Sequence, residues 1–154
     1  MKIVLYHPEI PQNTGNIGRL CVATNTELYL VRPLGFFLDS KEIRRSGLDY
    51  WENLKVTVVN DLEEIKSQNL DARFWYISTK GSQLYTEATY QPSDILVFGS
   101  EGSGLPSEIL EANKDSVLKI PMWGPVRSLN LSTSVGIVVY EAYRQLGWSH
   151  SFNK

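Results

Sequence analysis

The chain has 154 residues, of which 42% are hydrophobic and 21% are charged. This balance is typical of a folded globular protein and excludes a disordered or fibrous chain. The formal net charge of −2 excludes a protein that coats nucleic acid through a broad basic surface.

The N-terminal segment lacks the apolar stretch of a signal peptide, and no apolar run approaches the length of a membrane span. With one cysteine, Cys21, an internal disulfide cannot form, and a zinc or iron–sulfur site would lack thiolates. We therefore expect one cytoplasmic domain over residues 1–154, with no membrane contact and no metal.

Six short runs rich in β-branched and aromatic residues predict buried strands. In chain order they are Lys2 to Tyr6, Leu28 to Val31, Val56 to Val59, Phe74 to Ser78, Ile95 to Phe98 and Val117 to Ile120.

Helical spacing appears between several of these runs. The first such segment has Ile17, Leu20, Cys21 and Thr24 on one face, the second runs from Asp61 as cap to Ser67, and the third begins at Pro106 and ends at Ala112. The last helix carries an apolar stripe from Val135 to Leu146 and stops at Gly147. Strands alternating with helices predict an α/β fold, a mainly parallel sheet flanked by helices.

Ligands of open parallel sheets bind beyond the carboxyl ends of the strands. Three loops at such positions are rich in Gly, Asn, Ser and Pro: residues 7–18, 99–106 and 121–130. We expect the chemistry of the protein to reside in these loops.

In the loop 99–106, glycines let the backbone approach a ligand closely, although a tight structural turn explains the segment equally well. Its spacing matches neither a phosphate-binding P-loop nor the dinucleotide fingerprint. Glu101 either caps a helix or favours a cationic ligand over a pyrophosphate.

The loop 121–130 combines apolar side chains with an irregular backbone that can accept an adenine. The alternative is an ordinary connection in which Asn130 or Ser132 caps the last helix.

The segment 8–19 carries amides, prolines and Arg19, which suggests binding of a polar substrate. The alternative is helix capping by Asn13 or Thr14, with Arg19 in a surface ion pair.

We interpret His7 as structural and Cys21 as core. The basic segment 41–45 is either a local basic patch or a solvated helix face.

Taken together, these segments resemble the SPOUT-class RNA methyltransferases, most closely the TrmL (YibK) type that methylates the wobble-nucleotide ribose of tRNA. The resemblance rests on residues 8–21, 120–122, 128–132 and 138–142, and it extends through 44–50 and 79–81. Ser103 departs from the pattern, since several relatives carry a basic residue there.

The resemblance implies a C-terminal deep trefoil knot, which general topology rules would exclude, and S-adenosylmethionine as the cofactor. The implied cofactor contacts are Ile77, Gly99, Glu101, Ile120, Met122, Ser128 and Leu129. It also implies a homodimer in which Arg19 of one subunit meets the cofactor of the other, with the last helix as the dimer contact.

The implied reaction is methylation of the ribose 2′-hydroxyl of nucleotide 34, cytidine or a modified uridine, in the tRNA anticodon loop. The implied catalytic residues are Arg19, Ser128 and Asn130, and the implied substrate contacts are Asn13, Asn16, Arg19, Lys41, Arg44 and Arg45. The alternatives are a SPOUT enzyme acting on another RNA site and a nucleotide- or RNA-binding module without catalysis.

Overall fold

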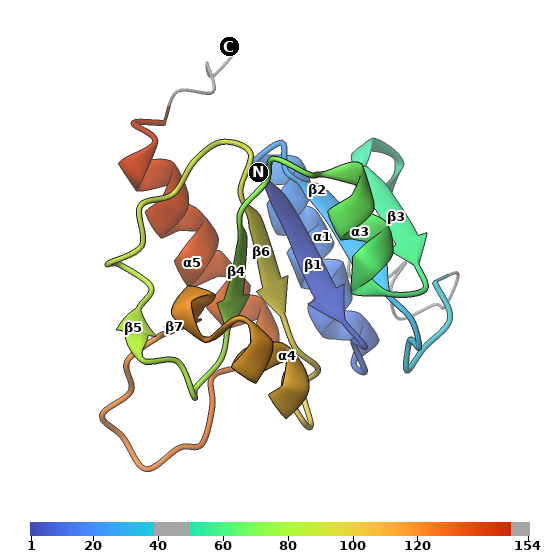
Figure 1. Ribbon diagram of the computed structural model, residues 1–154. Coiled ribbons are helices and arrows are strands. Elements are labelled where there is room, and N and C mark those ends of the chain that lie inside the picture. The colour runs from blue at the N-terminus through green and yellow to red at the C-terminus, as the bar shows by residue number, and fades with distance from the viewer. Residues whose placement is uncertain (39–49, 149–154) are drawn as a thin grey trace.

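The computed structural model describes residues 1–38 and 50–148 as a twisted parallel sheet covered by helices on both faces (Figure 1). The sheet has seven strands in the order β3-β2-β1-β6-β4-β7-β5. Their bounds are β1 Lys2–Tyr6, β2 Glu27–Val31, β3 Val56–Val59, β4 Phe74–Ile77, β5 Gln83–Leu84, β6 Ile95–Phe98 and β7 Val117–Lys119. The α/β class and the parallel sheet expected from the sequence are confirmed.

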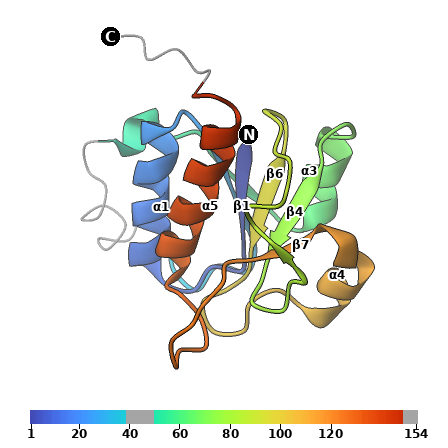
Figure 2. The ribbon, with the colours of Figure 1, turned by 90° about the vertical axis from the view of Figure 1, so that its left-hand side faces the viewer.

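Two helices, α1 (Pro11–Ala23) and α5 (Leu131–Gln145), lie side by side on one face of the sheet (Figure 2). The helices α3 (Leu62–Gln68) and α4 (Ser107–Ala112) cover the other face, and short 3-10 turns occur at Trp51–Asn53 and Lys114–Ser116. None of the helices in the described part of the chain is long and apolar enough to cross a membrane.

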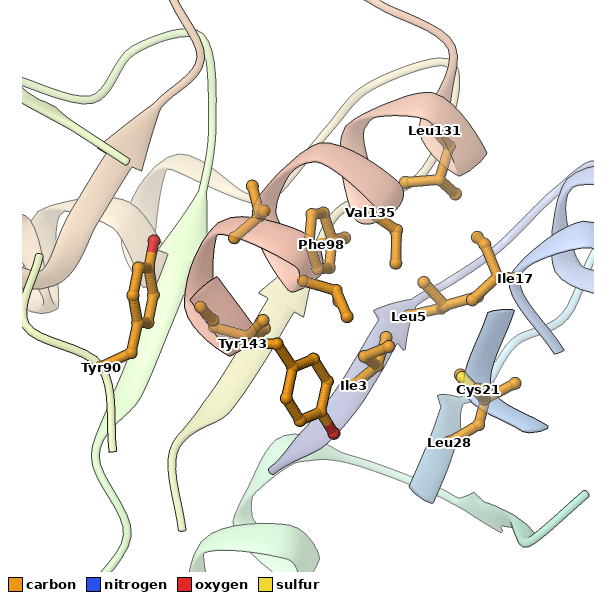
Figure 3. Packing of buried hydrophobic residues seen from close by; sticks show 14 of the residues in the cluster. Ile3, Leu5, Ile17, Cys21, Leu28, Tyr90, Phe98, Leu131, Val135 and Tyr143 are labelled. Carbon is orange, nitrogen blue, oxygen red and sulfur yellow. The ribbon is translucent and has the colours of Figure 1, made fainter. Parts of the chain in front are cut away.

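The alternation of side chains along the strands divides the core into two layers. In β1, Ile3 and Leu5 face α1 and α5, whereas Val4 belongs to the layer under α3 and α4. Figure 3 shows Ile17 of α1 and Val135 of α5 directed toward Leu5. The hydrophobic stripes read from the sequence therefore form the inner faces of α1 and α5.

The main error of the sequence reading is the start of α1. The segment 7–18 was expected to be mostly loop, but the helix begins at Pro11, and Asn13 and Thr14 are buried inside its first turns. The predicted capping by Asn13 or Thr14 is therefore wrong, because the N-cap residue is Ile10, whose side chain cannot accept a hydrogen bond.

Other helix boundaries follow the expected signals closely. Asp61 caps α3 by accepting from the backbone N–H of Glu64, and Asn130 caps α5. Gly147 adopts φ 67° just beyond α5, as its role as a stop requires. Pro106 is the N-cap of α4 and not its first helical residue.

The carboxylate of Asp94 links the amino ends of β4 and β6 through hydrogen bonds. Its side chain is fully buried and accepts hydrogen bonds from Arg73 (2.9 and 3.1 Å), from the indole N–H of Trp75 (2.9 Å) and from the backbone of Gln91 (2.9 Å). This end of the sheet lies opposite the carboxyl ends, where the three loops meet.

We predict that Asp94→Ala lowers the free energy of unfolding by about 2–3 kcal/mol, since it removes the buried carboxylate that accepts from Arg73, Trp75 and Gln91. Urea unfolding followed by circular dichroism measures the change. The control is Glu63→Ala, which breaks the exposed pair with Lys66 and should cost less than about 1 kcal/mol. Equal effects of the two substitutions would show that Asp94 does not anchor the strands.

Candidate functional site

The carboxyl ends of β4, β6 and β7 surround a cavity of about 460 Å³. Its walls are the loops that follow these three strands, residues 77–80, 98–105, 120, 122 and 127–130, with Ile10 and Asn13 at the start of α1 and Leu131 and Ser134 on α5. The volume lies within the range of about 300–1,000 Å³ that small-molecule sites occupy. The cavity walls include each residue predicted to contact the cofactor: Ile77, Gly99, Glu101, Ile120, Met122, Ser128 and Leu129.

The glycine loop, residues 99–105, folds back on itself between β6 and α4. Ser100 and Gly104 exchange two backbone hydrogen bonds of 3.0 and 3.3 Å, and Gly104 has φ 70°. A Cβ at Gly99 would overlap the backbone of Gly104 and Leu105. The absence of a side chain at Gly99 therefore allows the two ends of the loop to pass close together at the wall of the cavity.

Glu101 caps α1, a helix that its own preceding residues leave uncapped. The carboxylate accepts from the backbone N–H of Glu9 at 2.8 Å, from that of Ile10 at 3.1 Å and from the side-chain amide of Asn13 at 3.0 Å. A negative charge at this end is favoured by the helix dipole. Of the two roles considered for Glu101, helix capping is thus realised, and on α1.

Asn13 connects the glycine loop to the start of α5. Its amide donates to Glu101, and its carbonyl oxygen accepts from the side chain of Asn130 at 2.9 Å. The Asn130 oxygen in turn accepts from the backbone N–H groups of Ser132 and Thr133. One hydrogen-bonded chain, Glu101–Asn13–Asn130, therefore holds all three predicted loops together.

This arrangement changes the reading of Asn13, which was expected to contact substrate. Asn13 is only 5% exposed, and both ends of its amide group are used within the protein. The structure gives it a bridging position at the wall of the cavity.

Arg19 and Asn16 lie away from the cavity, on the exposed side of α1. The Arg19 guanidinium is 5.6 Å from the ring centroid of Tyr50. Among residues 1–38 and 50–148 no carboxylate pairs with it, so the surface ion pair considered for Arg19 is not found there. Lys41, Arg44 and Arg45 fall outside the described residues.

Two cations at the cavity, Lys80 and Arg127, were missed as site residues. The signal was available, because each lies in a loop that follows the carboxyl end of a parallel strand.

In the described ranges, no group of three His, Cys, Asp or Glu side chains could hold a metal ion. Cys21 is core as expected, and burial raises the pKa of its thiol to about 12.

The comparisons with known proteins agree on one family of methyltransferases. Residues 1–140 match the SpoU rRNA Methylase family. The tRNA (cytidine(34)-2′-O)-methyltransferase of Escherichia coli K12 is 46% identical over 149 residues, which cover 96% of this chain and 95% of that protein. The enzyme of the same name from Saccharophagus degradans is 49% identical and covers 97% of both chains.

Solved structures agree with this match. A structure concerned with the 2-OH methylation of C/U34 on tRNA superposes with a TM-score of 0.90 at 45% identity and covers 96% of both chains. An rRNA methyltransferase from Sinorhizobium meliloti with AdoMet bound has a TM-score of 0.83 at 27% identity, and the match covers 94% of this chain but 56% of that one.

We predict that Asn13→Ala lowers the free energy of unfolding by about 1–2 kcal/mol, because it removes a buried side chain together with its hydrogen bonds to Glu101 and Asn130. The measurement is chemical denaturation monitored by tryptophan fluorescence. Gln12→Ala, at the exposed neighbouring position of α1, is the control and should change stability by less than about 0.5 kcal/mol. If the two variants were equally stable, the chain Glu101–Asn13–Asn130 would not hold the loops together.

Proposed function

The chain belongs to the SpoU rRNA Methylase family, and on this premise we propose that it methylates the ribose 2′-hydroxyl of nucleotide 34 in tRNA. The protein is an S-adenosylmethionine-dependent methyltransferase, and its acceptor is cytidine or a modified uridine at the wobble position. The observation that carries this conclusion is the cavity, whose walls bring together all the residues expected to contact the cofactor.

The extent of the matches favours tRNA over ribosomal RNA as the substrate. The two tRNA enzymes are covered over at least 95% of their length, whereas the ribosomal RNA enzyme is about half unmatched. A match over nearly the whole length of tRNA enzymes supports tRNA as the substrate. The alternative of a module without catalysis does not fit the family.

The cavity suits S-adenosylmethionine in its chemistry. Ile77, Ile120 and Leu129 offer apolar contacts for an adenine, and the glycine loop presents main chain. Bound there, the cofactor supplies a methyl group on a positively charged sulfur. The carboxylate of Glu101 keeps negative charge at the wall while it caps α1, which favours a cationic ligand.

We assign positioning of the ribose to Ser128 and Asn130. Both line the cavity, and neither can serve as a strong base. The Asn130 oxygen is used in capping α5 and one of its two amide N–H groups donates to Asn13, so the second amide N–H is the group left for the reaction. Orientation of the hydroxyl toward the methyl group can supply about 7–11 kcal/mol of the lowering of the barrier.

Arg19 completes the site in our proposal, from the opposite subunit of a homodimer. In its own subunit Arg19 is exposed and lies outside the cavity. A guanidinium has five donors and no acceptor, so it orients the ribose and an adjacent phosphate. A phosphate oxygen or a water molecule then takes the hydroxyl proton.

The helical layer of α1 and α5 is the surface that we propose for this dimer (Figure 2). Tyr140 of α5 is 49% exposed and its ring lies 5.9 Å from that of Trp148, itself 44% exposed. Exposed aromatic pairs of this kind are characteristic of protein interfaces. Tyr143 of the same helix is buried and bonded to Thr24 and Thr26, so it lies in the core of the subunit.

The strand order supports the expected C-terminal knot. β7 pairs with β4 on one side and with β5 on the other, and β5 belongs to the connection between β4 and β6. β7, which follows β6 in the chain, therefore lies between β4 and β5, two segments that both precede β6. We propose that residues 1–154 form one SPOUT methyltransferase domain, that this crossing is its trefoil knot, and that the enzyme acts in the cytoplasm.

The RNA contacts are also part of the proposal. Asn16 and Arg19 are exposed on α1, and Trp123, at 92% exposure, stands out from the loop 121–130. Trp123 can stack on a splayed base of the anticodon loop. From the sequence alone we also propose Lys41, Arg44 and Arg45 as RNA contacts.

The purified protein, incubated with S-adenosylmethionine and a tRNA carrying cytidine 34, should produce 2′-O-methylcytidine at that position. Mass spectrometry of the digested RNA detects the product. A matched tRNA with 2′-deoxycytidine at position 34 should gain no methyl group there. Failure to methylate the ribose tRNA, or methylation only at another nucleotide, would refute the proposed function.

We expect Arg19→Ala to abolish methyl transfer while leaving the Kd for S-adenosylmethionine within a few-fold, because the cavity walls hold the cofactor whereas Arg19 acts on the ribose and phosphate of the RNA. Methyl incorporation and isothermal calorimetry measure the two quantities. Lys114→Ala, which removes an exposed cation at the amino end of β7, should retain activity. Loss of cofactor binding in the Arg19 variant would contradict its assigned role.

A further inference from the structure

The Arg19 guanidinium lies over the ring of Tyr50, the residue directly before the 3-10 turn Trp51–Asn53. Arg19 Cζ is 5.6 Å from the centroid of that ring, within the distance of about 6 Å over which a cation and an aromatic face attract each other. Tyr50 is only 8% exposed, whereas Arg19 is exposed. A long, solvated side chain therefore rests on a buried aromatic surface.

Tyr50 is fixed to the helix that carries Arg19. Its hydroxyl donates to the backbone carbonyl of Gly15, and Gly15 and Arg19, four residues apart, lie on the same face of α1. Side chains of an α-helix lean toward its amino end, so Arg19 leans toward the turn that binds this hydroxyl. The packing is close, since a Cβ at Gly18 would lie 3.0 Å from Leu54 Cδ2 and 3.7 Å from Tyr50 Cε2. The position of the ring is therefore set by α1 itself.

A contact with an aromatic ring leaves the donors of a guanidinium available. The ring attracts the cation through its π electrons, so the N–H groups of arginine can still bind oxygen acceptors. A carboxylate would instead occupy donors and neutralise the charge, and none is paired with Arg19 among residues 1–38 and 50–148. The contact with Tyr50 can therefore orient Arg19 without using the groups that a ribose and a phosphate require.

The hydroxyl of Tyr50 does not act as a base in this arrangement. Burial raises the pKa of the phenol, so the group is protonated at neutral pH, and it donates its proton to the Gly15 carbonyl. What Tyr50 offers to Arg19 is an uncharged ring.

We propose that Tyr50 is a positioning residue that holds the Arg19 guanidinium in the direction in which it meets the ribose and phosphate of nucleotide 34. This inference rests on the proposed function and adds how its cation is aimed. Tyr50 touches no reacting atom and acts through Arg19. The attraction between a ring and a cation is weak at an exposed site and stronger once water is removed, so bound RNA strengthens the contact when orientation is needed.

The test changes the electrons of the ring and keeps its shape. Amber suppression places phenylalanine or 3,4,5-trifluorophenylalanine at position 50, and the fluorines withdraw charge from the face that attracts the cation. We expect kcat/KM for a tRNA anticodon stem-loop to be about five- to thirtyfold lower with the fluorinated ring, the range of a cation–π contact from an exposed to a desolvated site. The Kd for S-adenosylmethionine and the midpoint of urea unfolding should not differ. Equal kcat/KM for the two rings would overturn the inference.

Tyr50→Leu provides a second arm, in which the ring is removed with and without Arg19. We expect the Kd for the stem-loop, measured with S-adenosylhomocysteine present, to rise about five- to thirtyfold, but less than about twofold when Arg19 is already alanine. The control is Trp51→Leu, which removes the neighbouring ring that packs at Gly18 of the same helix, and it should change the Kd less than about twofold in both backgrounds. An equal rise for Tyr50→Leu in both backgrounds would show that Tyr50 does not act through Arg19.

These measurements separate the inference from the function on which it rests. If Arg19→Ala leaves methyl transfer unchanged, the role of Arg19 in the proposed function fails. If Arg19→Ala abolishes transfer while both rings at position 50 support it equally, the function stands and the role of Tyr50 is wrong.

Discussion

The architecture of the site depends on the hydrogen-bonded chain Glu101–Asn13–Asn130. α1 begins at Pro11, and the side chain of its N-cap residue Ile10 cannot accept a hydrogen bond, so the N–H groups that lead into the helix need an acceptor from elsewhere. Glu101 supplies that acceptor from the loop after β6, and Asn13 carries the connection onward to the cap of α5. These hydrogen bonds bring three loops, distant in sequence, to one edge of the sheet.

The glycine loop lines the cavity of about 460 Å³ on one side and a smaller cavity on the other. Gly99 lets the two ends of the loop pass close together, and Gly102 leaves room for the Glu9 carboxylate. Ser100 and Ser103, whose hydroxyls are 2.8 Å apart, form the partition. Sites held on such a connected frame can align two reactants with little reorganisation. Ser103, where several relatives carry a basic residue, leaves this partition short and neutral.

The sequence predicted the strands well because each is a short apolar run whose burial is decided locally, as in β1 and β6. The sequence did not predict the features whose position depends on contacts with residues far along the chain. The start of α1 resembled a loop because its capping group, Glu101, lies far along the chain. β5 has only two residues and exists through its pairing with β7. Asn13 resembled a substrate contact because an amide in a loop and an amide bridging two loops look alike in sequence. The predicted place of Arg19 depends on a second subunit.

The most direct test of this account is a crystal structure of the protein with S-adenosylhomocysteine bound. We predict the ligand in the cavity of about 460 Å³ between the glycine loop and residues 127–131, with the contacts among Glu101, Asn13 and Asn130 retained. A ligand bound elsewhere, or in the cavity only after this hydrogen-bonded chain has broken, would contradict the account.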